Sequence, residues 1–156
     1  MQSFKSCLFA AVIAGAGSPA FAAPENYTID PTHTYPSLEF SHMGMSVWRG
    51  KFNKSAGKVV LDRAARTGTV DVTIDVSSIS FGLAAMDEKA RSDDFFDTDK
   101  FPAAVYKGKI RFSADKPSAV DGQITIRGIT RQVMLTINIF NCMPHTSFLS
   151  IGCGMQ

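Results

Sequence analysis

The chain has 156 residues, with 16 basic and 14 acidic side chains and 45% hydrophobic residues. This length suits one domain that buries its own core. Because the two kinds of charge nearly balance and are interspersed along the chain, the composition argues against a nucleic-acid-binding protein, which needs a concentrated basic surface.

Residues 1–22 have the three parts of a secretory signal peptide. Lys5 supplies a positive charge, residues 7–17 are apolar, and Ala20-Phe21-Ala22 has the small-x-small form of a cleavage site. The apolar run is about 11 residues long, whereas a membrane-spanning helix needs ~20. We therefore expect an exported protein whose mature part, residues 23–156, is a single domain without a membrane span.

Alternation of apolar and polar side chains predicts β-strands through most of the mature chain. The alternating runs are 38–42, 47–52, 70–76, 106–112, 120–126 and 133–139. Inside one of them, Asp121-Gly122 is interpreted as a bulge or a turn. Strand-like runs that recur about every 10 to 15 residues are typical of an antiparallel sandwich or barrel.

One segment breaks this rhythm. Residues 84–92, AAMDEKARS, are rich in helix-forming residues and place acidic side chains ahead of basic ones. This pattern predicts a short helix in an otherwise all-β chain.

The residue types used in catalysis are present, but they do not form a known motif. His33, His42 and His145 are the three histidines, and their spacing matches no zinc site. The chain contains no Gly-x-Ser-x-Gly turn for a serine nucleophile and no glycine-rich phosphate loop. The aspartates between positions 93 and 99 lack the glycine and the terminal glutamate of a calcium loop. We therefore expect neither an enzyme nor a metal protein, and no required cofactor.

Cys142 and Cys153 are the two cysteines of the mature chain. Export places them in an oxidising compartment, which makes them a disulfide candidate. Two alternatives stay open, namely two free thiols and a metal site, although a separation of eleven positions with one histidine between them is not a known zinc spacing.

Three blocks of residues carry a family resemblance. The first contains Tyr27, Asp30, His33, Phe40, His42, Gly50 and Phe52; the second contains Ser78-Ile79, Asp87, residues 91–97 (RSDDFFD) and Phe101-Pro102; the third contains residues 122–130 (GQITIRGIT), Val133 and Leu135. In this order, and in an exported β chain, the blocks resemble the YceI-like family of periplasmic polyisoprenoid-binding proteins. The resemblance extends from Tyr27 to about Leu135.

The resemblance implies a lipocalin-like, up-and-down antiparallel β-barrel of about eight strands, located in the periplasm. It also implies an apolar channel that binds an isoprenoid lipid or isoprenoid quinone, and a homodimer. Burial of a prenyl tail stabilises a complex by roughly 0.8 kcal/mol per methylene-sized group, so such binding needs no covalent chemistry. Transport, storage or sequestration of the lipid would follow.

Aromatic side chains beside turns and beside the predicted helix are the candidates for the wall of this channel. The wall candidates are Phe40, Phe52, Phe81, Phe95, Phe96, Phe101 and Tyr106. His33 and His42 are candidate polar partners of the ligand. Asp30, Arg91 and Asp94 are expected to fix the helix and one end of the barrel through charged hydrogen bonds.

The carboxyl-terminal part departs from the family pattern. Family members run some tens of residues further, so we expect one or more C-terminal strands to be missing and a sheet edge to be exposed. The rival function is an envelope stress-related interaction module with a filled barrel and no lipid ligand. An enzyme that acts on a bound lipid is a weaker alternative.

Overall fold

The computed structural model describes residues 23–144 and 151–155, so the predicted signal peptide and His145 lie outside the described residues. The elements in chain order are β1 (Glu25–Thr28), β2 (Ser37–His42), β3 (Ser46–Phe52), β4 (Ser55–Asp62), β5 (Thr67–Asp75), a 3-10 turn (Val76–Ser78), β6 (Ile79–Ser80), α1 (Ala84–Arg91), β7 (Ala103–Ser113), β8 (Lys116–Ile126), β9 (Ile129–Thr136), β10 (Phe140–Pro144) and β11 (Ile151–Met155). The structure thus confirms an all-β chain with one short helix, at the place predicted. That helix is too short to cross a bilayer, and no other helix in the described ranges could do so.

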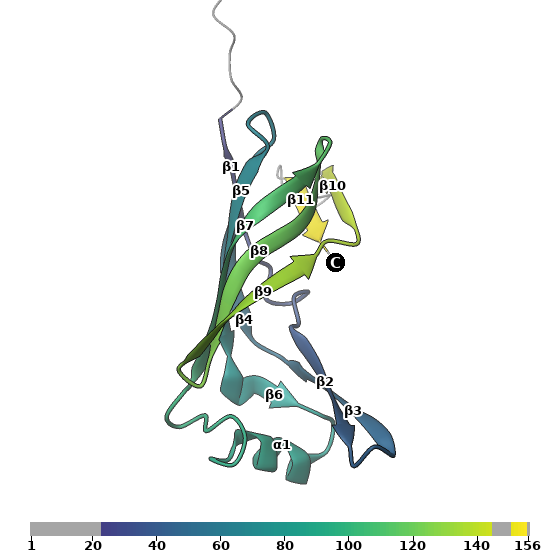
Figure 1. The fold of residues 1–156 in the computed structure, drawn as a ribbon, viewed down its shortest axis with the longest axis vertical. Coiled ribbons are helices and arrows are strands. Elements are labelled where there is room, and N and C mark those ends of the chain that lie inside the picture. Colours follow the sequence, from purple (N-terminus) through teal and green to yellow (C-terminus); the bar gives the residue numbers. More distant parts are fainter. Residues whose placement is uncertain (1–22, 145–150, 156) are drawn as a thin grey trace, which may run out of the picture.

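The strands form three antiparallel sheets. The largest contains six strands in the order β1-β4-β5-β7-β8-β9. A second sheet, β2-β3-β6, lies together with α1 at one end of the large sheet, and the β10–β11 hairpin lies toward its other end (Figure 1). Within residues 23–144 and 151–155, no hydrogen-bonded ladder joins the three sheets, and β1 and β9 are the edges of the large one.

Alternation decides which side chains of the large sheet face its core. Val72 and Ile74 of β5 lie opposite Tyr106 and Ala104 of β7, and directly paired residues point to the same face of a sheet. The buried side chains on this face, with those that pack against it from other elements, gather in two clusters. The lower core contains Phe52, Ile74, Val76, Ile79, Ala90 and Ala104, and the upper core contains Val59, Leu61, Val70, Tyr106, Ile110 and Val120. The lower core joins α1 and the β2-β3-β6 sheet to the large sheet. Phe52 belongs to β3 and Ala90 to α1.

The interpretation of Asp121-Gly122 as a bulge or turn is wrong. Both residues lie inside β8, where Gly122 pairs with Gly108. A Cβ atom at Gly122 would meet the carbonyl oxygen of Lys107, so glycine is needed here for close packing of two strands and not for a turn. The register instead shifts between Arg111 and Phe112, which places the irregularity of β8 at Ser118.

The strand predicted over 133–139 ends earlier, at Thr136. The next backbone amide, that of Ile137, donates to the carbonyl of Ser118 at 2.9 Å. Ser118 is the residue that the register shift leaves out of the β7–β8 pairing. The ladder therefore ends where its partner strand becomes irregular.

The segment that follows α1 is fixed by hydrogen bonds to its backbone. Arg127, in the turn between β8 and β9, donates to the carbonyls of Phe95 and Asp93 at 2.7 and 3.0 Å. At the other end of the helix, the Asp87 carboxylate accepts from the backbone amide of Phe81 at 2.6 Å. These contacts hold the helix and its exit loop against one end of the large sheet, beside the lower core.

Candidate ligand-binding site

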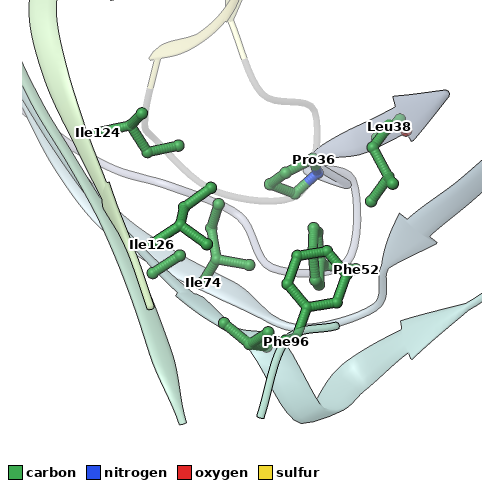
Figure 2. Close-up of a pocket in the computed structure, with 10 residues that line it drawn as sticks. Pro36, Leu38, Phe52, Ile74, Phe96, Ile124 and Ile126 are labelled. Carbon is green, nitrogen blue, oxygen red and sulfur yellow. The ribbon is translucent and has the colours of Figure 1, made fainter. Parts of the chain in front are cut away.

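An apolar cavity of about 170 Å³ lies beside the lower core. Its lining residues are Pro36, Ser37, Leu38, Phe52, Ile74, Val76, Phe96, Ala104, Ile124 and Ile126. Figure 2 shows the side chains of seven of them pointing into one common space. Ser37 is the one polar residue of this lining, and no ionisable side chain belongs to it. The cavity can exclude water from a hydrocarbon group, but it offers no acid, base or metal ligand.

Each wall of the cavity follows from strand alternation. On the large sheet, Ile74, Ala104, Ile124 and Ile126 come from β5, β7 and β8 and share one face. On the opposite side, Leu38 of β2 pairs with Gly50 of β3, next to Phe52. The loop after α1 adds the ring of Phe96. The cavity therefore lies between the two sheets.

The apolar face of the large sheet continues beyond the cavity onto its edge strand β9. Ile129 lies directly opposite the cavity residue Ile126, and Leu135 lies opposite Val120. Both side chains on β9 are solvent-accessible, at 58% for Ile129 and 45% for Leu135. Arg131, opposite Ile124, is the cation on this same face. An apolar surface thus runs from the cavity to an edge that faces solvent.

Two of the predicted wall residues, Phe52 and Phe96, line the cavity together. Their ring centroids are 5.7 Å apart in an edge-to-face arrangement. Such aromatic pairs fix each other's orientation and give the cavity a firm wall.

Phe40 and Phe81 pack on each other instead of on the cavity. Their ring centroids are 5.5 Å apart, and Trp48 lies 6.3 Å from Phe81. We call these three residues the aromatic cluster. Phe81 occupies the space over Gly50, where a Cβ atom would collide with its ring. The cluster lies between the cavity and the turn of the β2–β3 hairpin, because Phe40 and Trp48 are partners in that hairpin.

The other three wall candidates lie away from the cavity lining. Phe95 is exposed and faces Lys89, and Phe101 packs beside Gly128. Tyr106 belongs to the upper core, where its hydroxyl donates to the carbonyls of Val120 and Val133 at 3.0 and 3.1 Å. Burial, followed by the nearby charge of Asp121, raises the pKa of the Tyr106 phenol.

The predicted polar partners do not line the cavity. His33 Nδ1 lies 2.7 Å from the carboxylate of Asp30, and both side chains are exposed. Hydrogen bonds from Thr32 and then from His33 lower the pKa of Asp30 to about 2. His42 packs edge-on against Trp48 at 5.8 Å. The part of the chain that the structure describes contains no group of three or more residues suited to a metal ion.

The residues expected to have structural roles make local contacts. Asp30 accepts from the backbone amide of Thr32 at 2.8 Å as well as from its hydroxyl. Asp94 pairs with Lys89 across the helix exit. Arg91 contributes its carbonyl, which accepts from the backbone amide of Thr98 at 3.1 Å.

Cys142 is disulfide-bonded, and its partner position across the β10–β11 ladder is Cys153. The guanidinium of Arg63 lies 3.0 Å from the Cys142 sulfur and also contacts Glu25 at 3.3 Å. The side chain of Cys153 lies outside the described residues, so its pairing with Cys142 stays a prediction.

Aromatic residue type does not predict most of the cavity wall. Leu38, Ile74, Ile124 and Ile126 are aliphatic, and they carry no signal in composition. Their signal is positional, since each occupies the apolar phase of an alternating strand. Ala104 was not predicted because it contributes through its small volume, which leaves space for the cavity, and not through a distinctive side-chain chemistry.

Two known proteins show what this chain is similar to in sequence. A UPF0312 protein of Shewanella denitrificans is 34% identical over 75% of this chain, and a UPF0312 protein of Vibrio parahaemolyticus is 31% identical over 84% of it. The chain spans 63% of the length of the first relative and 72% of the second.

Solved structures with the same fold include BcnA of Burkholderia cenocepacia and a YCEI protein of Campylobacter jejuni. Each is 25% identical to this chain; their TM-scores are 0.58 and 0.57, over 71% and 78% of this chain and 72% of each of theirs. The YceI structures are lipocalin-like β-barrels, which confirms the predicted fold class. A model of the YceI-like domain matches residues 27–154, and the chain belongs to the YceI-like family.

Proposed function

We propose that the chain is a periplasmic carrier that binds the hydrocarbon tail of an isoprenoid lipid or isoprenoid quinone. The cavity between the two sheets carries this proposal, because its lining is aliphatic and aromatic apart from Ser37 and contains no ionisable group. A prenyl tail is transferred out of water into such a site with a gain of roughly 0.8 kcal/mol per methylene-sized group. The signal-peptide pattern of residues 1–22 supports the location.

The size of the cavity indicates how such a tail would be held. At about 170 Å³ it is smaller than the ~300–1,000 Å³ of pockets that enclose a whole drug-sized ligand. We infer that the cavity takes one end of the tail, and that the rest lies along the exposed apolar face of β9, over Ile129 and Leu135. The ligand would then cover side chains that are otherwise exposed to water.

A filled interaction module is the second candidate function. The observation that favours it is the small cavity itself, since the upper core on the same face is packed with side chains. An enzymatic role has less support, because His33 and Asp30 pair with each other in an exposed loop outside the cavity.

The two candidates predict different contents of the purified protein. Gentle purification from the periplasm, organic extraction and mass spectrometry should yield a prenyl lipid or quinone in a stoichiometric amount. A well-folded protein that is consistently empty would favour the interaction module.

A variant that fills the cavity gives a direct test. Ala104→Leu places a larger side chain in the cavity, whereas Ala103→Leu, the neighbour on the opposite face of β7, leaves the cavity unchanged. We expect Ala104→Leu to weaken the binding of farnesol by about tenfold or more, because the lost space is equivalent to two or more buried methylene groups. Native mass spectrometry measures this. Equal farnesol binding by both variants would place the ligand elsewhere.

A further inference from the structure

The turn of the β2–β3 hairpin exposes large apolar side chains. Met43 and Met45 are each 79% exposed, and Val47 beside them is 52% exposed. Leu83, at the start of α1, is exposed as well. We call Met43, Met45 and Val47 the hairpin tip. Figure 1 shows the hairpin projecting away from the six-stranded sheet, so the tip is available to a partner.

The β2–β3 hairpin carries few charges, and its turn carries none. Between Phe40 and Gly50 the sequence contains no acidic residue, and its one fully charged side chain is Arg49. Lys51 follows two positions later on the same face of β3. Glu39, the acid of this hairpin, is paired with Arg49 at 2.6 Å. Glu39 neutralises Arg49, so Lys51 leaves the hairpin with an excess of one base behind its apolar tip. This excess is complementary to an anionic lipid surface.

The tip is continuous with the cavity. At the other end of the same hairpin, Leu38 and Phe52 line the cavity. Between the two ends lies the aromatic cluster, with Phe40 and Trp48 paired across the hairpin and Phe81 packed against both. An apolar tail could therefore follow a path of apolar side chains from the tip to the cavity. Trp48 also suits this place, because tryptophan is enriched where an apolar phase meets water.

We propose that the hairpin tip docks on the surface of an anionic phospholipid bilayer, so that a prenyl tail passes between the bilayer and the cavity. The inference rests on the proposed function for the identity of the tail. A second copy of the chain fits the tip less well, because these few side chains fall short of the ~800 Å² per partner that a standard stable interface buries.

Vesicles that contain no isoprenoid test the docking step by itself. The protein is mixed with vesicles of phosphatidylethanolamine and phosphatidylglycerol, and the bound fraction is measured by flotation. Trp48 is the only tryptophan of the chain, so quenching of its fluorescence by brominated acyl chains reports on the tip directly. We expect flotation and quenching for the unaltered protein.

The tip variant is the double substitution Met43→Ser and Met45→Ser. Its matched control is Met134→Ser, which changes a methionine of similar exposure (65%) on β9. We expect the tip variant to partition about tenfold more weakly and to lose Trp48 quenching, since binding scales with the apolar area that enters the lipid. The control should bind as the unaltered protein does.

Farnesol binding without vesicles separates the two proposals. Retained farnesol binding by the tip variant, together with lost flotation, supports docking as a distinct step. Farnesol binding by an unaltered protein that neither floats nor shows quenching overturns docking and leaves the carrier function standing. Flotation without any farnesol binding overturns the carrier function instead. If light scattering shows that the tip variant turns a dimer into a monomer, the tip belongs to a second copy and the docking proposal is wrong.

Discussion

Two residues on the same face of β7 separate a filled region of the molecule from a hollow one. Tyr106 fills the upper core with a ring that is only 4% exposed, and its hydroxyl is bonded to two backbone carbonyls. Ala104, two positions earlier, is equally buried but leaves room for the cavity. Both positions satisfy the same alternation of apolar and polar residues. The volume of the side chains, and not their hydrophobicity, therefore distinguishes the candidate ligand site from ordinary core.

The strands around the filled region have adapted to Tyr106. Gly122 of β8 lies beside the ring, and a Cβ atom there would come within 2.8 Å of the tyrosine hydroxyl. It would also approach the Cα atom of Gly108 to 2.7 Å. The missing side chain of Gly122 thus leaves the space that the tyrosine hydroxyl occupies.

The largest effect is expected when the filled region is emptied. Tyr106→Ala removes a buried ring and two hydrogen bonds, and should lower the free energy of unfolding by about 3–5 kcal/mol. Phe96→Ala, in the hollow region, removes a half-buried ring beside an existing cavity and should cost about 1–2 kcal/mol. Urea denaturation of both variants measures the difference. Equal losses would show that the two regions are packed alike.

The sequence predicts most of the strands that build both regions. Period-two alternation correctly predicted β2, β3, β5, β7 and β8, and composition predicted α1. β4 was not predicted because Val59, Val60 and Leu61 are consecutive apolar residues, which hide the alternation. β1 and β6 are short and depend on pairing with distant strands, for which a single sequence carries no signal.

The candidate site was predicted less completely than the fold. Phe52 and Phe96 were placed in the wall by their type, and the structure puts both at the cavity. Phe40 and Phe81 have the same composition signal, yet they pack on each other. Phe40 lies on β2 and Phe81 directly follows β6, so the β2-β3-β6 sheet brings together rings that are far apart in the sequence. That contact is tertiary, so residue type alone could not distinguish the two pairs.

A smaller effect is expected from crowding the filled region. Gly122→Ala adds one methyl group against the backbone of β7 and against Tyr106, and should lower stability by about 1–3 kcal/mol because the strands must move apart. Gly44→Ala is the matched control in the hairpin, where a Cβ atom meets nothing within 4 Å but the φ angle is +74°. Only backbone strain acts there, and we expect about 1 kcal/mol. Thermal unfolding of both variants would separate crowding from strain.

The smallest effect is expected in an exposed loop outside both regions, where burial plays no part. The pKa of Asp30 is lowered from 3.8 to about 2 by hydrogen bonds from Thr32 and His33. A carboxyl whose pKa is lower in the folded state stabilises the protein above about pH 4, and this contribution is lost as the pH falls toward 2. Because Asp30 is exposed to solvent, we expect a local change in the loop and little change in global unfolding.

The measurement is an NMR titration of the Asp30 carboxyl carbon in the unaltered protein and in two variants. Thr32→Val should raise the pKa of Asp30 more than His33→Ala does, since the Thr32 hydroxyl has the larger influence. An Asp30 that titrates near 3.8 in the unaltered protein would contradict the hydrogen-bonded loop. If His33→Ala raises the pKa of Asp30 and Thr32→Val does not, the positive charge of the imidazolium, and not the threonine hydroxyl, lowers that pKa.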